Sequence, residues 1–178
     1  MKKFLMTLAI LVAMVSNCFA AYNVDVCDFD SDTFFRNYNH LVRFKGYSNS
    51  VAIDESMITS QSNQYSETVI MPLKNFSDGE GAVIGLVIDQ QGYIWEFNLQ
   101  NYREGLSDDM TAAFEIALYT IGLEPDEMYD VVTEMENTGY VNKYFPGIGK
   151  YLEIDGDALK NRGVGRIEIL AHSRIETP

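Results

Sequence analysis

The most regular pattern in the chain is an unbroken apolar run followed by strict alternation. Residues 82–88, AVIGLVI, are almost entirely apolar and rich in β-branched side chains, as in a central strand. Residues 89–92, DQQG, are typical of a tight turn, and every second residue of the next segment is apolar. The pattern predicts a β-hairpin whose second strand turns an aromatic face to the core. That face comprises Tyr93, Trp95, Phe97 and Leu99.

Three segments show the apolar spacing of amphipathic helices. The first spans residues 31–46, with Ser31 or Asp32 as its N-cap. The second spans 107–122 and the third 125–139, each closed by a glycine. Because only two residues separate the last two segments, they are expected to form a helical hairpin. The apolar stripes are, in order, Phe34, Tyr38 and Leu41; Met110, Phe114, Ala117, Leu118 and Ile121; and Met128, Val131, Val132 and Met135.

Further strands are predicted on both sides of the helical pair. Residues 47–64 place short apolar pieces among Ser and Asn, which favours a weak strand or hairpin, and residues 65–73 favour a stronger strand. After a turn at residues 146–147, the patterns of 151–154 and 164–171 indicate two closing strands. The sheet is therefore expected to contain strands from both halves of the chain.

The predicted order of elements is α-β-β-β-β-α-α-β-β. It indicates an α+β fold with a mostly antiparallel sheet packed against an N-terminal helix and a central helical hairpin. Regular β-α-β alternation is absent, which argues against a parallel, doubly wound sheet. A length of 178 residues with 47% apolar content suits one compact domain. We expect the helices to cover one face of the sheet and to leave the other face for a ligand or partner.

The first twenty residues have the composition of a secretory signal peptide. Lys2 and Lys3 precede an apolar run over residues 4–15, and residues 16–20 end in small side chains. The run is short for a permanent membrane span. We predict a signal peptide over residues 1–20, cleavage after Ala20, and one acidic α+β domain over residues 21–178. The mature protein is then expected in the periplasm or the medium of a bacterium.

A second export route is suggested by the segment Val15-Ser16-Asn17-Cys18. It is similar to the lipobox of bacterial lipoproteins, in which the cysteine becomes the acylated first residue. Asn17 departs from the small residue that normally precedes that cysteine. We therefore favour cleavage after Ala20, with a lipid anchor at Cys18 as the alternative. Neither route includes a transmembrane segment in the mature protein.

The mature domain is strongly acidic. Of the 13 Lys and Arg residues, cleavage removes Lys2 and Lys3 and leaves 11 against 26 Asp and Glu residues, a formal charge of −15. Such a surface repels phosphate backbones, so we expect no nucleic-acid partner. Basic proteins, cations and neutral ligands remain compatible with this charge, which also serves solubility.

Cleavage after Ala20 also leaves Cys27 as the sole thiol in an oxidising compartment. No internal disulfide can then form. The neighbours Asp25, Asp28 and Asp30 disfavour a thiolate, because reactive thiols lie in electropositive surroundings. We expect Cys27 to be a small buried or half-buried side chain, with an intermolecular disulfide as the next alternative.

Two acidic segments are candidates for a metal site or a partner site. Asp28, Asp30 and Asp32 alternate as at the start of an EF-hand loop, but Thr33 and Asn39 occupy the positions where that loop needs Gly and Glu. These acids are expected to cap and charge the first helix instead. The predicted third helix is also acidic, and we expect internal pairing or solvation, with a docking face for a basic protein as the alternative. Its acids are Glu124, Asp126, Glu127, Asp130, Glu134 and Glu136, and the basic partners considered are Lys160, Arg162 and Arg166.

Other candidate constellations are weaker. Only His40 and His172 are available as imidazole ligands, each expected to be partly buried and structural, and a Cys27–His40 thiol-imidazole pair lacks any local oxyanion-binding pattern. Two further groups were considered. One is a carboxylate cluster of Glu153, Asp155 and Asp157, although we expect Asp155-Gly156-Asp157 to be the exit turn of the strand. The other is an aromatic patch of Tyr140, Tyr144 and Phe145, which we expect to fill the junction between the helical pair and the closing strands.

The sequence therefore assigns no catalytic residue, no cofactor-binding residue and no metal ligand. No Walker loop, nucleophile elbow, dinucleotide fingerprint or zinc-protease motif occurs. We expect an exported bacterial binding protein that contacts an unidentified protein or small ligand without catalysis. The alternatives are an inhibitor or immunity-type protein for a basic partner, and a secreted enzyme whose residues are gathered only by the fold.

Overall fold

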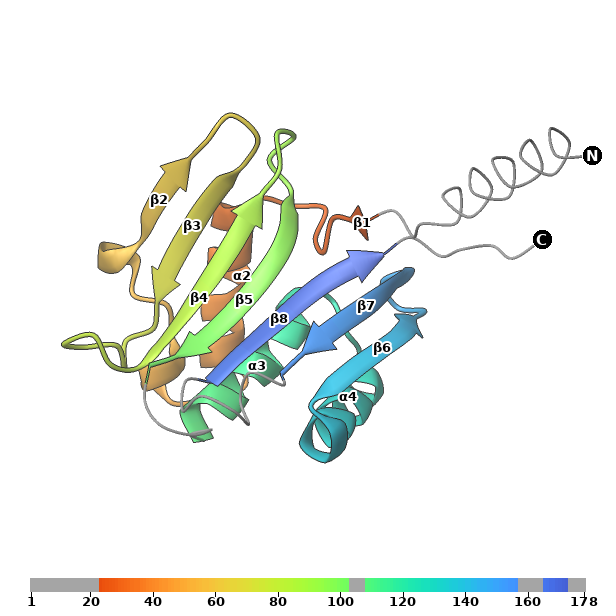
Figure 1. The fold of residues 1–178 in the computed structure, drawn as a ribbon. Helices are drawn as coiled ribbons and strands as arrows, with labels where there is room; N and C mark the ends of the chain where they lie inside the picture. The colour runs from red at the N-terminus through yellow and green to blue at the C-terminus, as the bar shows by residue number, and fades with distance from the viewer. Residues whose placement is uncertain (1–22, 103–107, 157–164, 173–178) are drawn as a thin grey trace, which may run out of the picture.

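The computed structural model describes residues 23–102, 108–156 and 165–172 (Figure 1). Residues 1–20, and with them the predicted leader and Cys18, lie outside the described ranges. The helices are α2 (Ser31–Phe44), α3 (Asp108–Thr120) and α4 (Pro125–Thr138), with 3-10 turns η2 (Asn49–Val51) and η3 (Glu55–Met57). The strands are β1 (Asn23–Val24), β2 (Thr59–Ser62), β3 (Glu67–Pro72), β4 (Ala82–Ile88), β5 (Ile94–Asn101), β6 (Tyr140–Phe145), β7 (Lys150–Asp155) and β8 (Gly165–His172).

One antiparallel sheet joins the two halves of the chain. Its strand order is β2-β3-β4-β5-β8-β7-β6, and the short β1 pairs with the end of β8. Strand β8 returns to the middle of the sheet and pairs with both β5 and β7. Figure 1 shows the three helices on one side of this sheet. The predicted α+β class, the antiparallel sheet and the helical pair are confirmed.

The strand β6 was missed by the sequence prediction. The sequence predicts that Tyr140, Tyr144 and Phe145 fill the junction between the helical pair and the closing strands, but Tyr140–Phe145 is a strand that pairs with β7, from Tyr140 opposite Asp155 to Phe145 opposite Lys150. Its alternation is irregular because Asn142 and Lys143 are adjacent and polar, which hides the period of two. Phe145 and Val141 are buried, so part of the segment does fill the interior as expected.

The N-cap of α2 precedes the two predicted caps, Ser31 and Asp32, by one and two residues. Asp30 is the N-cap, and its Oδ1 accepts a hydrogen bond of 2.8 Å from the backbone N–H of Thr33. The helix buries Phe34, Tyr38 and Val42 against the sheet, where the ring of Phe34 packs 5.8 Å from that of Phe97. The opposite side of α2 therefore faces solvent.

The helical hairpin follows the predicted boundaries closely. Pro125 occupies the first turn of α4, and Gly139 ends the helix in the left-handed conformation at φ 77°. Glu124 and Glu127 form a reciprocal capping box at its N-terminus. Among the described helices, none has both the length and the apolar content that a bilayer span requires.

The predicted aromatic face of the hairpin is only half correct. Phe97 and Leu99 are fully buried, but Tyr93 and Trp95 are 38% and 37% exposed, and Ile94 is buried in their place. The register shifts between Val87 and Ile88, so one extra residue bulges from β5. A one-residue shift moves side chains to the other face of a strand, which explains why the alternation failed at this end.

Candidate functional site

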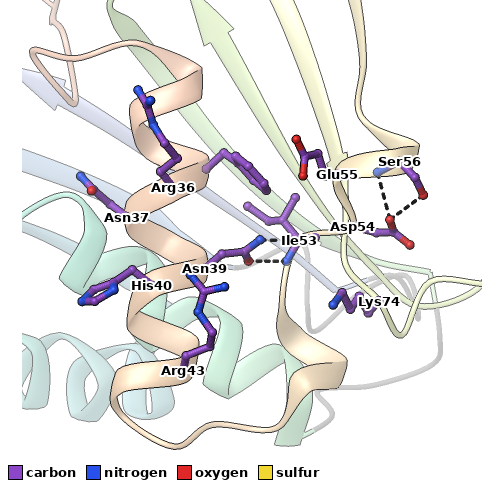
Figure 2. Close-up of a pocket in the computed structure, with 11 residues that line it drawn as sticks. Arg36, Asn37, Asn39, His40, Arg43, Ile53, Asp54, Glu55, Ser56 and Lys74 are labelled. Atoms are coloured by element: carbon purple, nitrogen blue, oxygen red, sulfur yellow. Dashed lines mark hydrogen bonds between the residues drawn. The ribbon is translucent and has the colours of Figure 1, made fainter.

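A groove of about 970 Å³ lies between the solvent-facing side of α2 and the segment around η3 (Figure 2). Phe35 and Ile53 contribute apolar surface, and the remaining lining side chains are polar or charged. Figure 2 shows Arg36 and Arg43 extending from α2 and Lys74 on the opposite wall. The polar lining residues are Arg36, Asn37, Asn39, His40, Arg43, Asp54, Glu55, Ser56 and Lys74.

Asn39 fixes the two walls of the groove together. Its Nδ2 donates to the carbonyl of Ile53 at 3.1 Å, and its Oδ1 accepts from the backbone N–H of Ile53 at 2.8 Å. Ile53 also bridges Leu73 in the antiparallel sense, and the N–H of Asp54 donates to the carbonyl of Pro72 at 2.8 Å. One helix side chain thus satisfies both polar groups of a buried residue and sets the width of the groove.

The groove is lined by three cationic side chains that form no ion pair with any carboxylate of the described chain. Within the described ranges, Arg36, Arg43 and Lys74 form no ion pair, and Lys74 donates one side-chain hydrogen bond of 3.3 Å to Asn49 Oδ1. Every other described Lys or Arg is engaged, three by carboxylates and one by the ring of a tyrosine. These four are Lys143, Lys150, Arg166 and Lys45.

The wall opposite α2 also carries two acids. Asp54 caps η3 and accepts hydrogen bonds from the hydroxyl and backbone N–H of Ser56 at 2.7 and 3.0 Å. These bonds, with a smaller contribution from the Lys74 ammonium, hold the pKa of Asp54 below its usual range. Glu55 is exposed. The acids therefore lie on the η3 wall, whereas α2 presents only cationic and neutral side chains to the groove.

The cations of α2 share one stripe of the helix. Arg36, His40 and Arg43 follow one another at spacings of four and three residues, which places them on the same side. His40 is exposed and its ring stacks on that of Phe44 at 5.9 Å, so the expectation that it would be partly buried was wrong. Arg36 and Arg43 are separated by about 10 Å along the helix axis.

Cys27 is buried, as expected. It is 3% exposed, and its backbone N–H donates to the carbonyl of Ile94 at 3.2 Å. Burial raises the pKa of the thiol to about 12. No hydrogen bond or ion pair links Cys27 to His40 in the described chain. The thiol is therefore placed as a core side chain and away from the groove lining.

The acids before α2 serve the fold. Asp30 caps the helix, and the hydrogen bonds from Thr33 hold its pKa below the usual range. Asp28 forms an ion pair with Lys150 at 2.7 Å. The described part of the chain contains no group of three or more His, Cys, Asp or Glu side chains arranged to hold a metal ion.

The acidic helix α4 is partly paired, by a residue that the sequence did not suggest. Asp130 forms an ion pair with Lys143 of β6 at 3.2 Å, and Glu127 accepts a hydrogen bond from the backbone N–H of Gly147 at 3.2 Å. Arg166 pairs with Glu168 instead of with α4. The other basic partners considered, Lys160 and Arg162, lie outside the described residues.

The face of the sheet without helices carries polar clusters centred on Arg166 and His172. The Nη2 of Arg166 lies 2.8 Å from Asn98 Oδ1 and 3.0 Å from Glu168 Oε1. Burial raises the pKa of Glu168, and Arg166 opposes that rise. Nearer the end of the sheet, His172 Nε2 lies 2.9 Å from Glu153 Oε2.

Two of the sequence-predicted groups therefore fall on this open sheet face. Glu153 and Asp155 share this face, because residues two positions apart in a strand point to the same side. Asp157 lies outside the described residues. Tyr140 is 41% exposed and donates to Glu153 Oε1 at 3.2 Å, and the ring of Tyr144 lies 5.2 Å from that of Tyr151. The lining of the groove beside α2 does not include these residues.

The acidic composition of the sequence did not indicate this groove. The available signal was the recurrence of Arg36, His40 and Arg43 on the polar side of a strongly amphipathic helix. The opposite wall, from Ile53 to Ser56 and Lys74, is separated from α2 in the sequence, so its proximity required the fold. Comparisons of this chain with protein-family models, curated proteins and solved structures find no match.

Proposed function

We propose that this chain is an exported bacterial binding protein that acts without catalysis and takes an acidic peptide segment of a partner in the groove between α2 and η3. The single observation that carries the proposal is the set of cations Arg36, Arg43 and Lys74, which have no ion pair in the described chain. The proposal also includes export of the protein by a signal peptide over residues 1–20, and it includes no nucleic-acid partner.

The charge balance of the whole chain makes this set informative. With 26 acidic against 13 basic residues, each Lys or Arg has an excess of opposite charges available. The groove lining holds three cations, Arg36, Arg43 and Lys74, against two acids, Asp54 and Glu55, so its formal charge is positive in an otherwise negative molecule. An external carboxylate can bind there in a charge-assisted hydrogen bond with an Arg guanidinium.

The form of the groove favours a peptide as the occupant. Its volume of about 970 Å³ is at the upper end of the range for small-molecule pockets, and it is open to solvent along α2. Arg36 and Arg43 are separated by about 10 Å, the span of three residues of an extended chain. Phe35 and Ile53 supply apolar contact between the charged positions. An extended segment with carboxylates three residues apart fits these spacings.

The absence of catalysis is proposed from the surroundings of the reactive side chains. Cys27 is buried, and its pKa of about 12 keeps the thiol protonated at neutral pH. His40 stacks on Phe44, and His172 contacts Glu153. Apart from Asp54 and Glu55 on the η3 wall, the polar groove lining consists of cations, amides, an imidazole and a hydroxyl group, which suit recognition of an anion.

Titration calorimetry with oligoglutamate tests the proposed binding. The double variant R36Q/R43Q is expected to lose at least tenfold in affinity, because each charge-assisted hydrogen bond contributes about 1.5–3 kcal/mol. Lys143→Gln is the matched control, since it removes a cation outside the groove and an exposed ion pair of small value. Oligolysine of equal length should not bind at the groove. Equal affinities of the double variant and the control would overturn the proposal.

Export is tested separately at the amino end of the protein. Protein recovered from the envelope or medium of its host should begin at Ala21 if cleavage follows Ala20. A chain that begins at an acylated Cys18 identifies the lipoprotein alternative. Recovery from the cytosol with Met1 intact would contradict export and leave the groove proposal to its own test.

A further inference from the structure

A second pocket, of about 540 Å³, lies where three segments meet at one end of the sheet. The segment after β1 contributes Asp25, the turn between β2 and β3 contributes Tyr65, and the turn after β4 contributes Asp89. Trp95 of β5 completes the lining together with apolar contributions from Val24 and Ile88. A pocket of this size matches small organic ligands.

The turns around the pocket are held in place by hydrogen bonds. Asp89 Oδ1 accepts from the backbone N–H groups of Gln91 and Tyr93 at 2.8 and 2.9 Å. Gln90 Nε2 donates across to the carbonyl of Gln64 at 3.2 Å, which links the β4–β5 turn to the β2–β3 turn. The walls that carry Asp89 and Tyr65 are therefore joined.

The register shift in the hairpin brings Trp95 to the pocket. Strict alternation would have buried Trp95 beside Phe97, but the bulge between Val87 and Ile88 reverses this end of β5. Trp95 is consequently 37% exposed, and Ile94 takes its place in the core. Bulges commonly re-aim a side chain beside a functional site. Because the bulge places the large aromatic side chain of Trp95 in the pocket lining and not in the core, we expect Trp95 to contact a ligand.

The carboxylates of Asp25 and Asp89 form no ion pair in the described part of the chain. Lys150 donates to the backbone carbonyl of Asp25 at 2.8 Å and to the carboxylate of Asp28 at 2.7 Å, and the carboxylate of Asp25 forms no ion pair in the described chain. Burial, followed by repulsion from Asp89, raises the pKa of Asp25, and the nearby Lys150 ammonium offsets only part of this rise. A cation between Asp25 and Asp89 would relieve that repulsion and replace lost hydration.

We propose that this pocket binds an organic cation with N–H donors, an alkylammonium or guanidinium group, between the carboxylates of Asp25 and Asp89 and the aromatic rings of Trp95 and Tyr65. Carboxylates accept the N–H groups, and aromatic faces attract the cation electrostatically. Val24 and Ile88 provide contact for an alkyl stem. The site is separate from the groove of α2 and favours the opposite charge, so it goes beyond the function proposed above.

The protein carries its own reporter for this site. Trp95 is the only tryptophan of the chain, so its fluorescence reports on the pocket directly. Protein recovered from its producing cells is titrated with butylammonium and, in parallel, with the neutral isostere 1-butanol. Butylammonium is expected to give a saturable change in Trp95 emission that 1-butanol does not give. Equal responses to the two compounds would overturn the proposal.

Variants separate a specific site from a general charge effect. Asp25→Asn keeps the shape of the side chain and is expected to weaken butylammonium binding about tenfold or more. Tyr65→Ala changes an exposed side chain and is expected to weaken binding several-fold. Glu136→Gln, an exposed acid of α4, is the matched control with an unchanged affinity. Unchanged affinity in Asp25→Asn and Tyr65→Ala would overturn the assignment.

The same titration distinguishes two sources of the cation. Tighter binding of spermidine than of a blocked lysine peptide indicates a free polyamine, and the reverse indicates a lysine side chain of a basic partner. Either preference must disappear in Asp25→Asn if the pocket is the site. A preference that survives this substitution would place the cation elsewhere and contradict the proposal.

Discussion

Replacing Asn39 by alanine should destabilise the protein much more than the same change at Asn37. Both residues lie on α2 and line the groove, but only Asn39 has side-chain hydrogen bonds in the described chain, at 3.1 and 2.8 Å to the backbone of Ile53. Ile53 is 1% exposed, so water cannot readily replace the lost partners of its N–H and carbonyl groups.

The magnitude follows from the two bonds. Each contributes about 1 kcal/mol net, so we expect the free energy of unfolding of Asn39→Ala to fall about 2 kcal/mol below that of Asn37→Ala. The gain in helix propensity from Asn to Ala is common to both variants and cancels in the comparison. For a domain of this size, the difference corresponds to about 4–8 °C in Tm.

Urea unfolding followed by far-UV circular dichroism measures this difference. Asn39→Asp refines the test, because it keeps an acceptor for the N–H of Ile53 but places a carboxylate against its carbonyl oxygen. We expect this variant to be as unstable as Asn39→Ala at neutral pH. If Asn39→Ala and Asn37→Ala unfold at the same urea concentration, Asn39 does not hold the groove walls together and the reasoning is refuted.

Three further predictions concern the core and the second pocket. Tyr38→Phe removes the hydroxyl that donates to the carbonyl of Val51 at 3.1 Å, and should lower the free energy of unfolding by about 1–2 kcal/mol, whereas the exposed Tyr129→Phe should change it by less than about 0.5 kcal/mol in the same denaturant titration. Because burial holds the pKa of Cys27 at about 12, native protein should react with a disulfide reagent at pH 8 far more slowly than urea-unfolded protein, and equal rates would contradict the buried placement. Since the pKa of Asp25 is raised by folding, its ionised form disfavours the native state, so Asp25→Asn should stabilise the protein at neutral pH and have little effect near about pH 3, as urea midpoints at the two pH values will show.

Much of the fold could be predicted because its elements repeat their period locally. The helical pair and the β4–β5 hairpin were located from apolar spacing, the proline at the start of α4 and the glycine at its end. Two features were missed for different reasons: the polar pair Asn142 and Lys143 hid the alternation of β6, and a single bulge in β5 exposed Trp95. Periodicity cannot report the pairing register that decides which face a side chain occupies.

The candidate sites could not be predicted for a different reason. Asp25, Tyr65, Asp89 and Trp95 come from four segments whose proximity depends on the order of strands in the sheet. The spacing of Arg36, His40 and Arg43 in the sequence places them in one stripe of α2. Only the structure shows which Lys and Arg side chains form ion pairs, and therefore that Arg36 and Arg43 form none in the described part of the chain. The overall negative charge favours acids as candidate site residues, whereas the sign of the charge on a local surface depends on which side chains are paired.

The most direct test of the central proposal is the mapping of oligoglutamate binding by two-dimensional ¹⁵N–¹H NMR. The groove proposal predicts that amide signals of residues 36–43 of α2, of 53–56 and of Lys74 shift in a saturable manner, and that these shifts disappear in R36Q/R43Q. Shifts confined to the open face of the sheet around Arg166, or no shifts at saturating peptide, would contradict the proposal that α2 and η3 form the binding site.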